Sequence, residues 1–329
     1  MLDNKFKICI NSIATEIPDN RISKMTLADD LEVADESGIE QICVANKGEL
    51  TTEMATRVVK KSIENINPKS IDELVCISEG ISDYLYMDTS KSILRNIGGR
   101  DDDVVYTYDI CTGNCGTIKT IQFVGNQLIS NKNISTAIIT SSLLWDNHSN
   151  KRKLGPTYLG DAAGSVVLQT NIGKNEILSI AYESISKYNL VAGFKYGGTK
   201  YELPKEALEN GEFTYGILDD SHLAGIIECS EEFSVLVGRK AIEKSGLSED
   251  EIDYIGIAGF SKKINNNILS KFNISKRIDL ISNEGFLGTV GAMRVLAEFI
   301  NNTTYKKGDV LLVISNGIDC NMEAMVIQK

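Results

Sequence analysis

The segment from Ser62 to Ile77 reads SIENINPKSIDELVCI, and the segment from Ala241 to Ile257 reads AIEKSGLSEDEIDYIGI. Each segment predicts the end of a helix, a polar turn and a short buried strand that begins after an Ile-Asp pair. The two Ile-Asp pairs lie 181 positions apart (252 minus 71). A unit that recurs in this way predicts two similar halves within one chain.

The similarity continues beyond these two strands. Each copy next has a turn that contains glycine, then a helix, then an apolar strand: 112–116, 117–128 and 136–140 in the first copy, and 285–289, 292–300 and 310–314 in the second. This alternation of strands and helices predicts sheets that are covered by helices on both faces. The chain has only four prolines and no flexible linker, so we expect the halves to form one rigid body.

The periodicity suggests three parts of the chain. Residues 1–170 form the predicted N-terminal half, and residues 229–329 form the predicted C-terminal half. Residues 171–228 have weaker periodicity and several Gly and Tyr residues. This connecting segment either caps a site or only decorates the surface.

Composition excludes several classes of function. The net charge of −11 argues against nonspecific nucleic-acid binding, which needs a cationic surface. The basic run at 151–153 is interpreted as a solvated loop. No apolar run is long enough for a membrane-spanning helix, and the first residues lack a secretory pattern, so we expect a cytoplasmic protein. Seven cysteines without a Cys-x-x-Cys pair, and only two histidines, predict no metal site.

Four landmarks carry a family resemblance. The first is a proline loop at 17–22, and the second is an aspartate before a turn, at 108–110. The third is a glycine-rich strand entry at 158–168 (YLGDAAGSVVL). The fourth is a C-terminal glycine loop at 315–317, followed by a strand at 324–326. In this order they resemble β-ketoacyl-ACP synthase III of the thiolase superfamily, over nearly the whole chain. The resemblance implies a thiolase-like α/β fold, in which two pseudo-repeated βαβ halves form a five-layer αβαβα arrangement. Within the third landmark, Asp161 is expected to bind nearby backbone donors.

The same resemblance implies a Cys-His-Asn triad, and this chain lacks it. The family's nucleophile lies five residues after the aspartate that corresponds to Asp109, and Gly116 fixes the register, so Asn114 occupies the nucleophile position. Ala258 occupies the histidine position and Phe286 the asparagine position. An amide cannot form a thioester, and each lost electrostatic group lowers the rate by about 100-fold or more. We therefore predict that decarboxylative condensation is absent.

Three interpretations stay open. The chain is a triad-deficient subunit that pairs with a cysteine-bearing homologue, since thiolase-fold proteins resemble one another in dimerising around the nucleophile turn. Alternatively, it is an active acyltransferase that uses Cys115, or it is a malonyl-thioester decarboxylase, although such relatives keep histidines. The residues 37–41 supply neither the Trp nor the Arg with which the family grips coenzyme A.

The expected ligands and partners follow from the resemblance. They are an acyl-CoA or acyl-ACP ligand with no other cofactor, an acyl carrier protein, and a homodimer or heterodimer with a thiolase-fold homologue. Four further residues are candidates for the pocket: Cys111, Trp145, Gly317 and Cys320.

Overall fold

The computed structural model describes residues 7–27, 37–79, 82–84, 87–99, 105–146, 148–149 and 152–329. Within these ranges, no helix combines the length and apolar character that crossing a membrane requires. Hydrogen bonds link ten of the strands into one sheet, which divides into two five-stranded halves.

The N-terminal half has parallel strands at one side and antiparallel strands at the other. Its order is β5 (Tyr106–Cys111), β4 (Glu73–Ser78), β6 (Ala137–Leu143), β9 (Ala162–Thr170) and β1 (Ile8–Glu16). Strand β4 is parallel to both β5 and β6, whereas β9 is antiparallel to β6 and β1. The helices of this half are α3 (Thr51–Ser62), α4 (Thr89–Asn96) and α5 (Thr117–Ser130).

The C-terminal half repeats this arrangement strand for strand. Its order is β14 (Lys276–Ile278), β13 (Tyr254–Ala258), β15 (Val310–Asn316), β16 (Asn321–Gln328) and β10 (Glu176–Ser184). Strand β13 is parallel to β14 and β15, and β16 is antiparallel to β15 and β10. The helices of this half are α7 (Asp220–Ser245), α8 (Lys262–Ser270), α9 (Ile281–Glu284) and α10 (Val290–Asn301).

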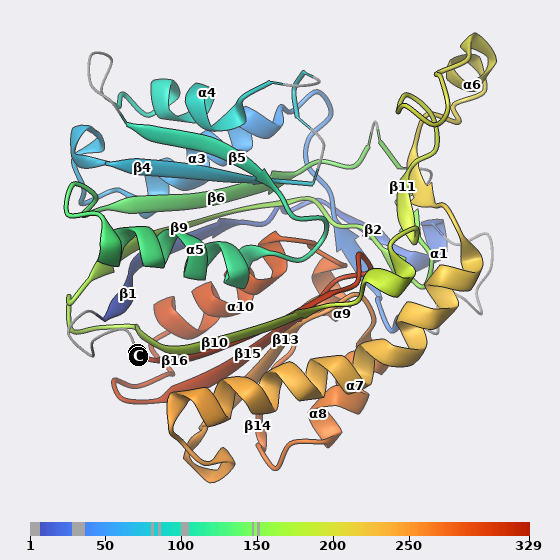
Figure 1. The fold of residues 1–329 in the computed structure, drawn as a ribbon. Coiled ribbons are helices and arrows are strands. Elements are labelled where there is room, and N and C mark those ends of the chain that lie inside the picture. Colours follow the sequence, from blue (N-terminus) through green and yellow to red (C-terminus); the bar gives the residue numbers. More distant parts are fainter. Residues whose placement is uncertain are drawn as a thin grey trace.

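The elements stack in five layers (Figure 1). Helices α5 and α10 lie between the two halves of the sheet, α3 and α4 cover the outer face of one half, and α7 and α8 cover the other. The middle layer is apolar because buried residues recur at helical spacing, such as Met293, Leu296 and Phe299 on α10. The predicted thiolase-like α/β architecture is confirmed. The halves also join edge to edge where β1 meets β10, at the pair Cys9 and Glu176.

The segment 171–228 begins in the sheet, continues into a protrusion and ends in the first turns of α7. Its first part is β10, which pairs with β16. Residues 189–218, here called the arm, then extend from the body on the right of Figure 1. The arm contains β11 (Ala192–Phe194), α6 (Lys205–Glu209) and β12 (Tyr215–Ile217). The small elements outside the arm are β2 (Arg21–Ser23), α1 (Lys24–Leu27), β3 (Gln41–Cys43), β7 (Lys153–Leu154) and β8 (Thr157–Tyr158). Short 3-10 turns lie at Pro68–Ser70, Ser186–Tyr188 and Glu249–Glu251.

A buried ion pair holds the turn before β9. Asp161 accepts backbone N–H groups from Ala45 at 2.8 Å and Trp145 at 2.9 Å, as expected. Arg152 donates to the same carboxylate at 2.7 and 2.8 Å. The solvated-loop interpretation of 151–153 is therefore wrong for Arg152, which is only 3% exposed. Lys151 lies outside the described residues.

Candidate functional site

The candidate site lies at the carboxyl ends of parallel strands from both halves. Glu79 follows β4, and Asn114 lies in the turn between β5 and α5. Ala258 is the last residue of β13. Because the carboxyl ends of parallel strands share one edge of a sheet, the two-fold repeat brings these ends together from the two halves.

Asn114 is enclosed by hydrogen bonds. Its side-chain amide nitrogen donates to the Glu79 carboxylate, and its oxygen accepts from the Tyr215 hydroxyl at 3.2 Å. Glu79 also accepts the backbone N–H of Thr289 at 2.6 Å, and the Thr289 hydroxyl lies 2.8 Å from that of Ser141. Asn114, at the predicted nucleophile position, is thus the centre of a polar network. This network links the N-terminal half, the C-terminal half and the arm.

Burial governs the charge on Glu79. It raises the pKa of this carboxyl from 4.5 to about 7, against the lowering effect of the N–H groups from Thr289 and Asn114. The side chain is 8% exposed, and a β-carbon added at Gly288 would lie 2.1 Å from its oxygen. Gly288 has a φ of +47°, so the turn requires glycine both for conformation and for room.

Cys115 is buried, and its thiol lies against Ser315 at the end of β15. Its thiol is 1% exposed and lies 3.4 Å from the Ser315 hydroxyl and 3.6 Å from the Ser315 carbonyl oxygen. Burial, and then the Glu323 and Asp319 carboxyls, raise the pKa of this thiol well above 9. Because the thiolate is the nucleophilic form, this environment opposes nucleophilic chemistry at Cys115.

A carboxyl group already occupies the N-terminus of α5. Glu323 on β16 accepts the backbone N–H groups of Ile118 at 2.7 Å and Lys119 at 3.1 Å. A helix N-terminus stabilises an anion through these free N–H groups and through the helix dipole. Glu323 therefore uses donors that would otherwise favour a thiolate. Burial nevertheless raises the pKa of Glu323 to about 7.

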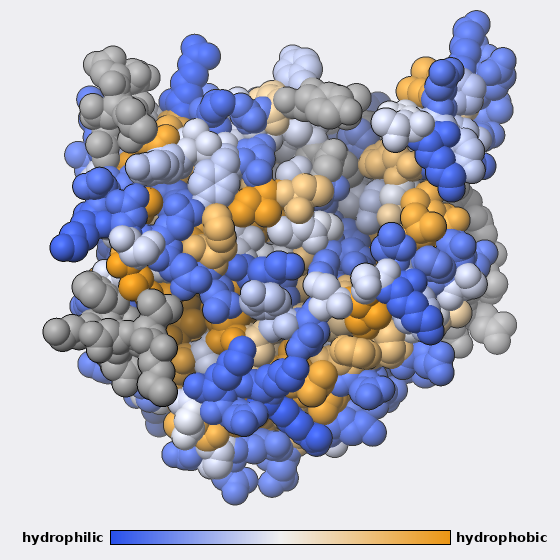
Figure 2. All heavy atoms as spheres, viewed as in Figure 1, coloured by the Kyte–Doolittle hydropathy of each residue, from blue (hydrophilic) through white to orange (hydrophobic). Residues whose placement is uncertain are grey.

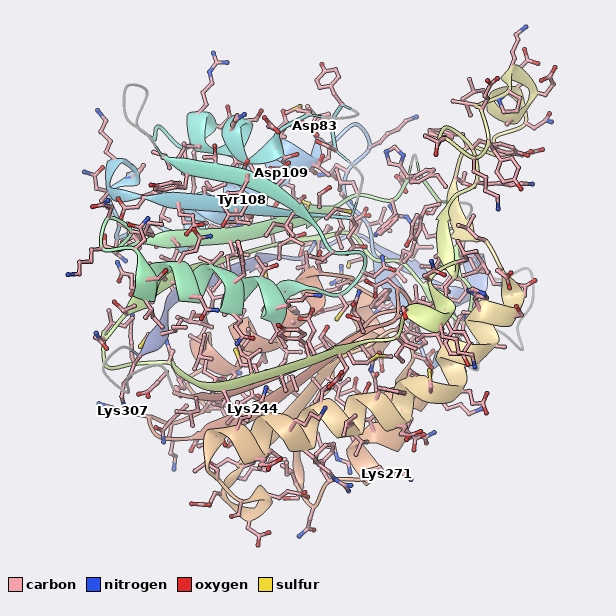
Figure 3. The ribbon with its side chains drawn as sticks, viewed as in Figure 1. Asp83, Tyr108, Asp109, Lys244, Lys271 and Lys307 are labelled. Atoms are coloured by element: carbon pink, nitrogen blue, oxygen red, sulfur yellow. The ribbon has the colours of Figure 1, made fainter. Side chains whose placement is uncertain are left out.

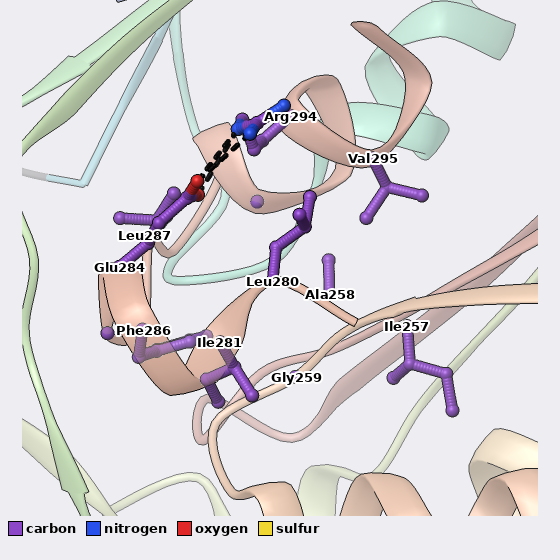
Figure 4. A pocket seen from close by; sticks show the side chains of 12 residues that line it. Ile257, Ala258, Gly259, Leu280, Ile281, Glu284, Phe286, Leu287, Arg294 and Val295 are labelled. Carbon is purple, nitrogen blue, oxygen red and sulfur yellow. Dashed lines mark hydrogen bonds and ion pairs between the residues drawn. The ribbon is translucent and has the colours of Figure 1, made fainter. Parts of the chain in front are cut away.

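Ala258 and Phe286 line one small cavity, shown in Figure 4. The cavity has a volume of about 20 Å³, which is room for about one water molecule. Phe286 is 3% exposed and packs edge-on against Phe260, with ring centroids 6.4 Å apart. On another wall, Arg294 donates to both carboxylate oxygens of Glu284. The positions expected for histidine and asparagine are thus adjacent, and the space between them is nearly filled.

The other sequence candidates lie in different surroundings. Trp145 is buried and packs against Tyr215, with ring centroids 5.4 Å apart. Cys320 is buried near the Tyr188 carbonyl oxygen, at 2.9 Å, and burial raises its pKa to about 12. Cys111, at the end of β5, is exposed and lines a larger cleft beside the arm. Gly317 lies beside Cys115.

Asp319 occupies the space that two glycines leave open. A β-carbon at Gly113 or at Gly317 would lie 2.1 or 2.0 Å from a carboxylate oxygen of Asp319. Burial raises the pKa of this carboxyl to about 8, although Asn321 donates a hydrogen bond to it at 2.7 Å. With the buried acids Glu79 and Glu323, the partly buried Asp319 makes a third acid around the turn 113–116. Within the described ranges, no group of three His, Cys, Asp or Glu side chains is placed to hold a metal ion.

Comparisons with known proteins give a consistent result. No family model matches the chain. A β-ketoacyl-(acyl-carrier-protein) synthase III from Paramagnetospirillum magneticum is 21% identical over 319 residues, which cover 92% of each protein. The same enzyme from Wolbachia pipientis wMel is 24% identical over 186 residues, which cover 53% of this chain and 56% of that protein. The chain is a distant homologue of these synthases.

Solved structures show the same fold. The synthase III from Aquifex aeolicus VF5 has a TM-score of 0.79 and 18% identity, and the match covers 98% of this chain and 100% of that one. The acyltransferase ChlB3 has a TM-score of 0.82 and 16% identity, covering 98% and 97%. A variant of Xanthomonas campestris OleA with bound lauric acid and lauroyl-CoA has a TM-score of 0.79 and 16% identity.

Sequence reasoning missed the acids and the tyrosine of this homologue's site. Glu323 had a usable signal, because it is a single acid within the apolar strand 321–328. Glu79 had a weaker one, since it directly follows a buried parallel strand. Tyr215 had none, because its contact with Asn114 spans 101 positions and depends on the path of the arm.

Proposed function

We propose that this chain is a non-catalytic, thiolase-fold subunit in acyl-thioester metabolism, which pairs with a cysteine-bearing homologue. The enclosure of Asn114 carries this proposal. Both polar atoms of its side-chain amide are engaged, by Glu79 and by Tyr215, at the position where the related synthases are expected to carry a nucleophile. Polar networks whose members are hydrogen-bonded stabilise a structure, and here the Asn114 amide keeps no unbonded polar atom that could act on a substrate.

The neighbouring positions support the same function. Ala258 has no side-chain proton to transfer, and the cavity beside it has room for only about one water molecule. Phe286 offers a hydrocarbon ring in place of an amide, so the oxyanion of a condensation reaction would lack its donors. Cys115 is buried, and its pKa is raised above 9, mainly by that burial.

The edge of β5 is the surface proposed for pairing. Strand β5 ends the sheet on this side, and its Tyr106 is 43% exposed. On the adjacent helix α5, Phe123 is 51% exposed, and its ring stands edge-on to Tyr108. Apolar side chains are visible among the polar ones over β5 and α5 (Figure 2). An uncovered edge strand with apolar neighbours favours addition of another strand.

Coexpression with a cysteine-bearing homologue from the same genome tests the pairing. We expect a stable heteromer by size-exclusion chromatography with light scattering, and a higher condensation rate than the homologue shows alone. Phe123→Glu should weaken the complex at least tenfold, whereas Tyr201→Glu, at a similarly exposed aromatic on the arm, should not. If the coexpressed chain and the homologue eluted separately, without forming a complex, the proposal would be contradicted.

Intact-mass measurement tests the absence of catalysis. After incubation with lauroyl-CoA, we expect no acyl adduct on the chain. An adduct that disappears in Cys115→Ser would instead favour an acyltransferase with a relocated nucleophile. These two experiments are independent, so pairing and inactivity can fail separately.

A further inference from the structure

A second, larger hollow lies outside the enclosed site. It has a volume of about 640 Å³ and is lined by the end of β5, by Met87 and Asp88, and by residues of the arm. We call it the arm cleft. Its volume is within the range of about 300–1,000 Å³ that is typical of small-molecule sites. Figure 3 shows Asp109 on β5, and this residue lines the cleft.

The arm cleft is separate from the position of Asn114. The ring of Tyr215 packs against Phe194, with centroids 5.7 Å apart, and its hydroxyl bonds to Asn114 on the other side. Phe194 lines the cleft, whereas neither Tyr215 nor Asn114 does. Tyr215 therefore stands between the two spaces, and a molecule in the cleft would contact Phe194 instead of Asn114.

Aromatic rings form the wall that the arm contributes. Phe194 packs against Phe213 with ring centroids 5.1 Å apart, and it forms a T-shaped pair with His148, with centroids 6.3 Å apart. Tyr196 lines the same wall. Tilted and edge-on rings of this kind favour a flat, apolar ligand, because aromatic pairs gain attraction beyond the area that they bury.

The charges around the cleft disfavour anions. Asp88 and Asp109 line it, and no described lining residue is Lys or Arg. Asp109 accepts the N–H groups of Thr89 and Ser90, at 2.8 and 2.9 Å, and Asp88 pairs with Lys91 outside the cleft. Burial lowers the pKa of His148, so its imidazole is neutral at neutral pH and adds no positive charge.

We propose that the arm cleft binds a neutral, aromatic small molecule, with Cys111 and His148 as the polar groups that can contact it. This site goes beyond pairing with a homologue, and because the cleft adjoins the β5 edge proposed for pairing, it is tested on the chain alone. Its ligand class also differs from an acyl-CoA, whose phosphates would meet the two aspartates without a compensating cation among the described lining residues.

Two dyes with one ring system test the ligand class. N-phenyl-1-naphthylamine is neutral, and 8-anilino-1-naphthalenesulfonate adds a single sulfonate to it. Titrations of the full chain alone, followed by fluorescence, should show saturable 1:1 binding of the neutral dye and at least tenfold weaker binding of the sulfonate. Equal affinities would overturn the assigned ligand class, and no saturable binding of the neutral dye would overturn the site.

The rate at which the Cys111 thiol is chemically modified shows whether the dye binds in the arm cleft. Among the described cysteines it is the exposed one, so N-ethylmaleimide should modify it first, as intact mass and a Cys111→Ser control will show. A saturating concentration of N-phenyl-1-naphthylamine should slow this reaction at least tenfold. An unchanged rate would show that the dye binds elsewhere, and the proposal would then fail.

A pair of glycine substitutions separates the cleft from the rest of the arm. Gly198 lines the cleft, and a β-carbon there would meet no atom within 4 Å, so Gly198→Leu should fold and partly fill the space. We expect at least a tenfold loss of affinity for the neutral dye. Gly216 on β12 has equally open surroundings but does not line the cleft, so Gly216→Leu should bind normally. Equal effects of the two substitutions would contradict the proposal.

Discussion

The replacement Glu79→Gln should remove part of the pH dependence of folding stability. Burial raises the pKa of Glu79 from 4.5 to about 7. Its contribution to stability is therefore fully present below pH 4.5 and is lost as the pH rises through about 7. A shift of this size corresponds to roughly 3 kcal/mol. Between pH 5 and pH 8, the wild-type free energy of unfolding should fall by roughly 2–3 kcal/mol more than that of the variant.

The variant can keep the hydrogen bonds of the network. A glutamine oxygen can accept from Thr289, and its amide can donate to Asn114 if that side chain turns over, leaving the Tyr215 hydroxyl to accept. Urea denaturation at pH 5, 6, 7 and 8 measures the difference, with Glu209→Gln on α6 as the control for loss of an exposed acid. Burial also raises the pKa of Glu323 to about 7, but this effect is common to both proteins. Parallel pH profiles for wild type and Glu79→Gln would refute the reasoning.

Two further substitutions test packing and the buried ion pair. Phe286→Ala should lower the free energy of unfolding by about 3–5 kcal/mol, because the Phe286 side chain is only 3% exposed. The control Phe123→Ala, at an exposed ring, should change the free energy of unfolding by about 0.5 kcal/mol or less. Equal effects in urea denaturation would argue against a filled site. Arg152→Ala should lower it by about 3–5 kcal/mol, since it leaves the Asp161 carboxylate buried without its cation. If Arg152→Ala melted within a degree of wild type, the pair would not stabilise the turn.

Much of the fold could be predicted from local patterns. The apolar run after the Ile-Asp pair became β4 in one half and β13 in the other, and both are central parallel strands. The predicted helix at 117–128 is α5, and the one at 292–300 is α10. These assignments succeeded because each element shows its burial through the spacing of its own side chains.

Loops were harder to interpret than strands and helices. Three consecutive basic residues at 151–153 suggested solvent exposure, yet Arg152 turns inward to a carboxylate nine positions away. A basic residue without hydrophobic periodicity around it carries no signal of burial, since its partner decides whether it can be buried. The candidate site was limited in the same way. Counting along the chain assigned Asn114 to the turn, but it could not show which groups would bind that amide.

The amino-acid sequence alone determined the two-fold repeat, the α/β layering and the identities of Asn114, Ala258 and Phe286 at the predicted triad positions. Only the tertiary structure decided that Cys115 faces inward, that Glu323 binds the start of α5, and that the arm brings Tyr215 to Asn114. The physical reason is separation along the chain. Periodicity reflects the burial of neighbouring residues, whereas these contacts join segments 101 to 205 positions apart and exist only after the halves pack together.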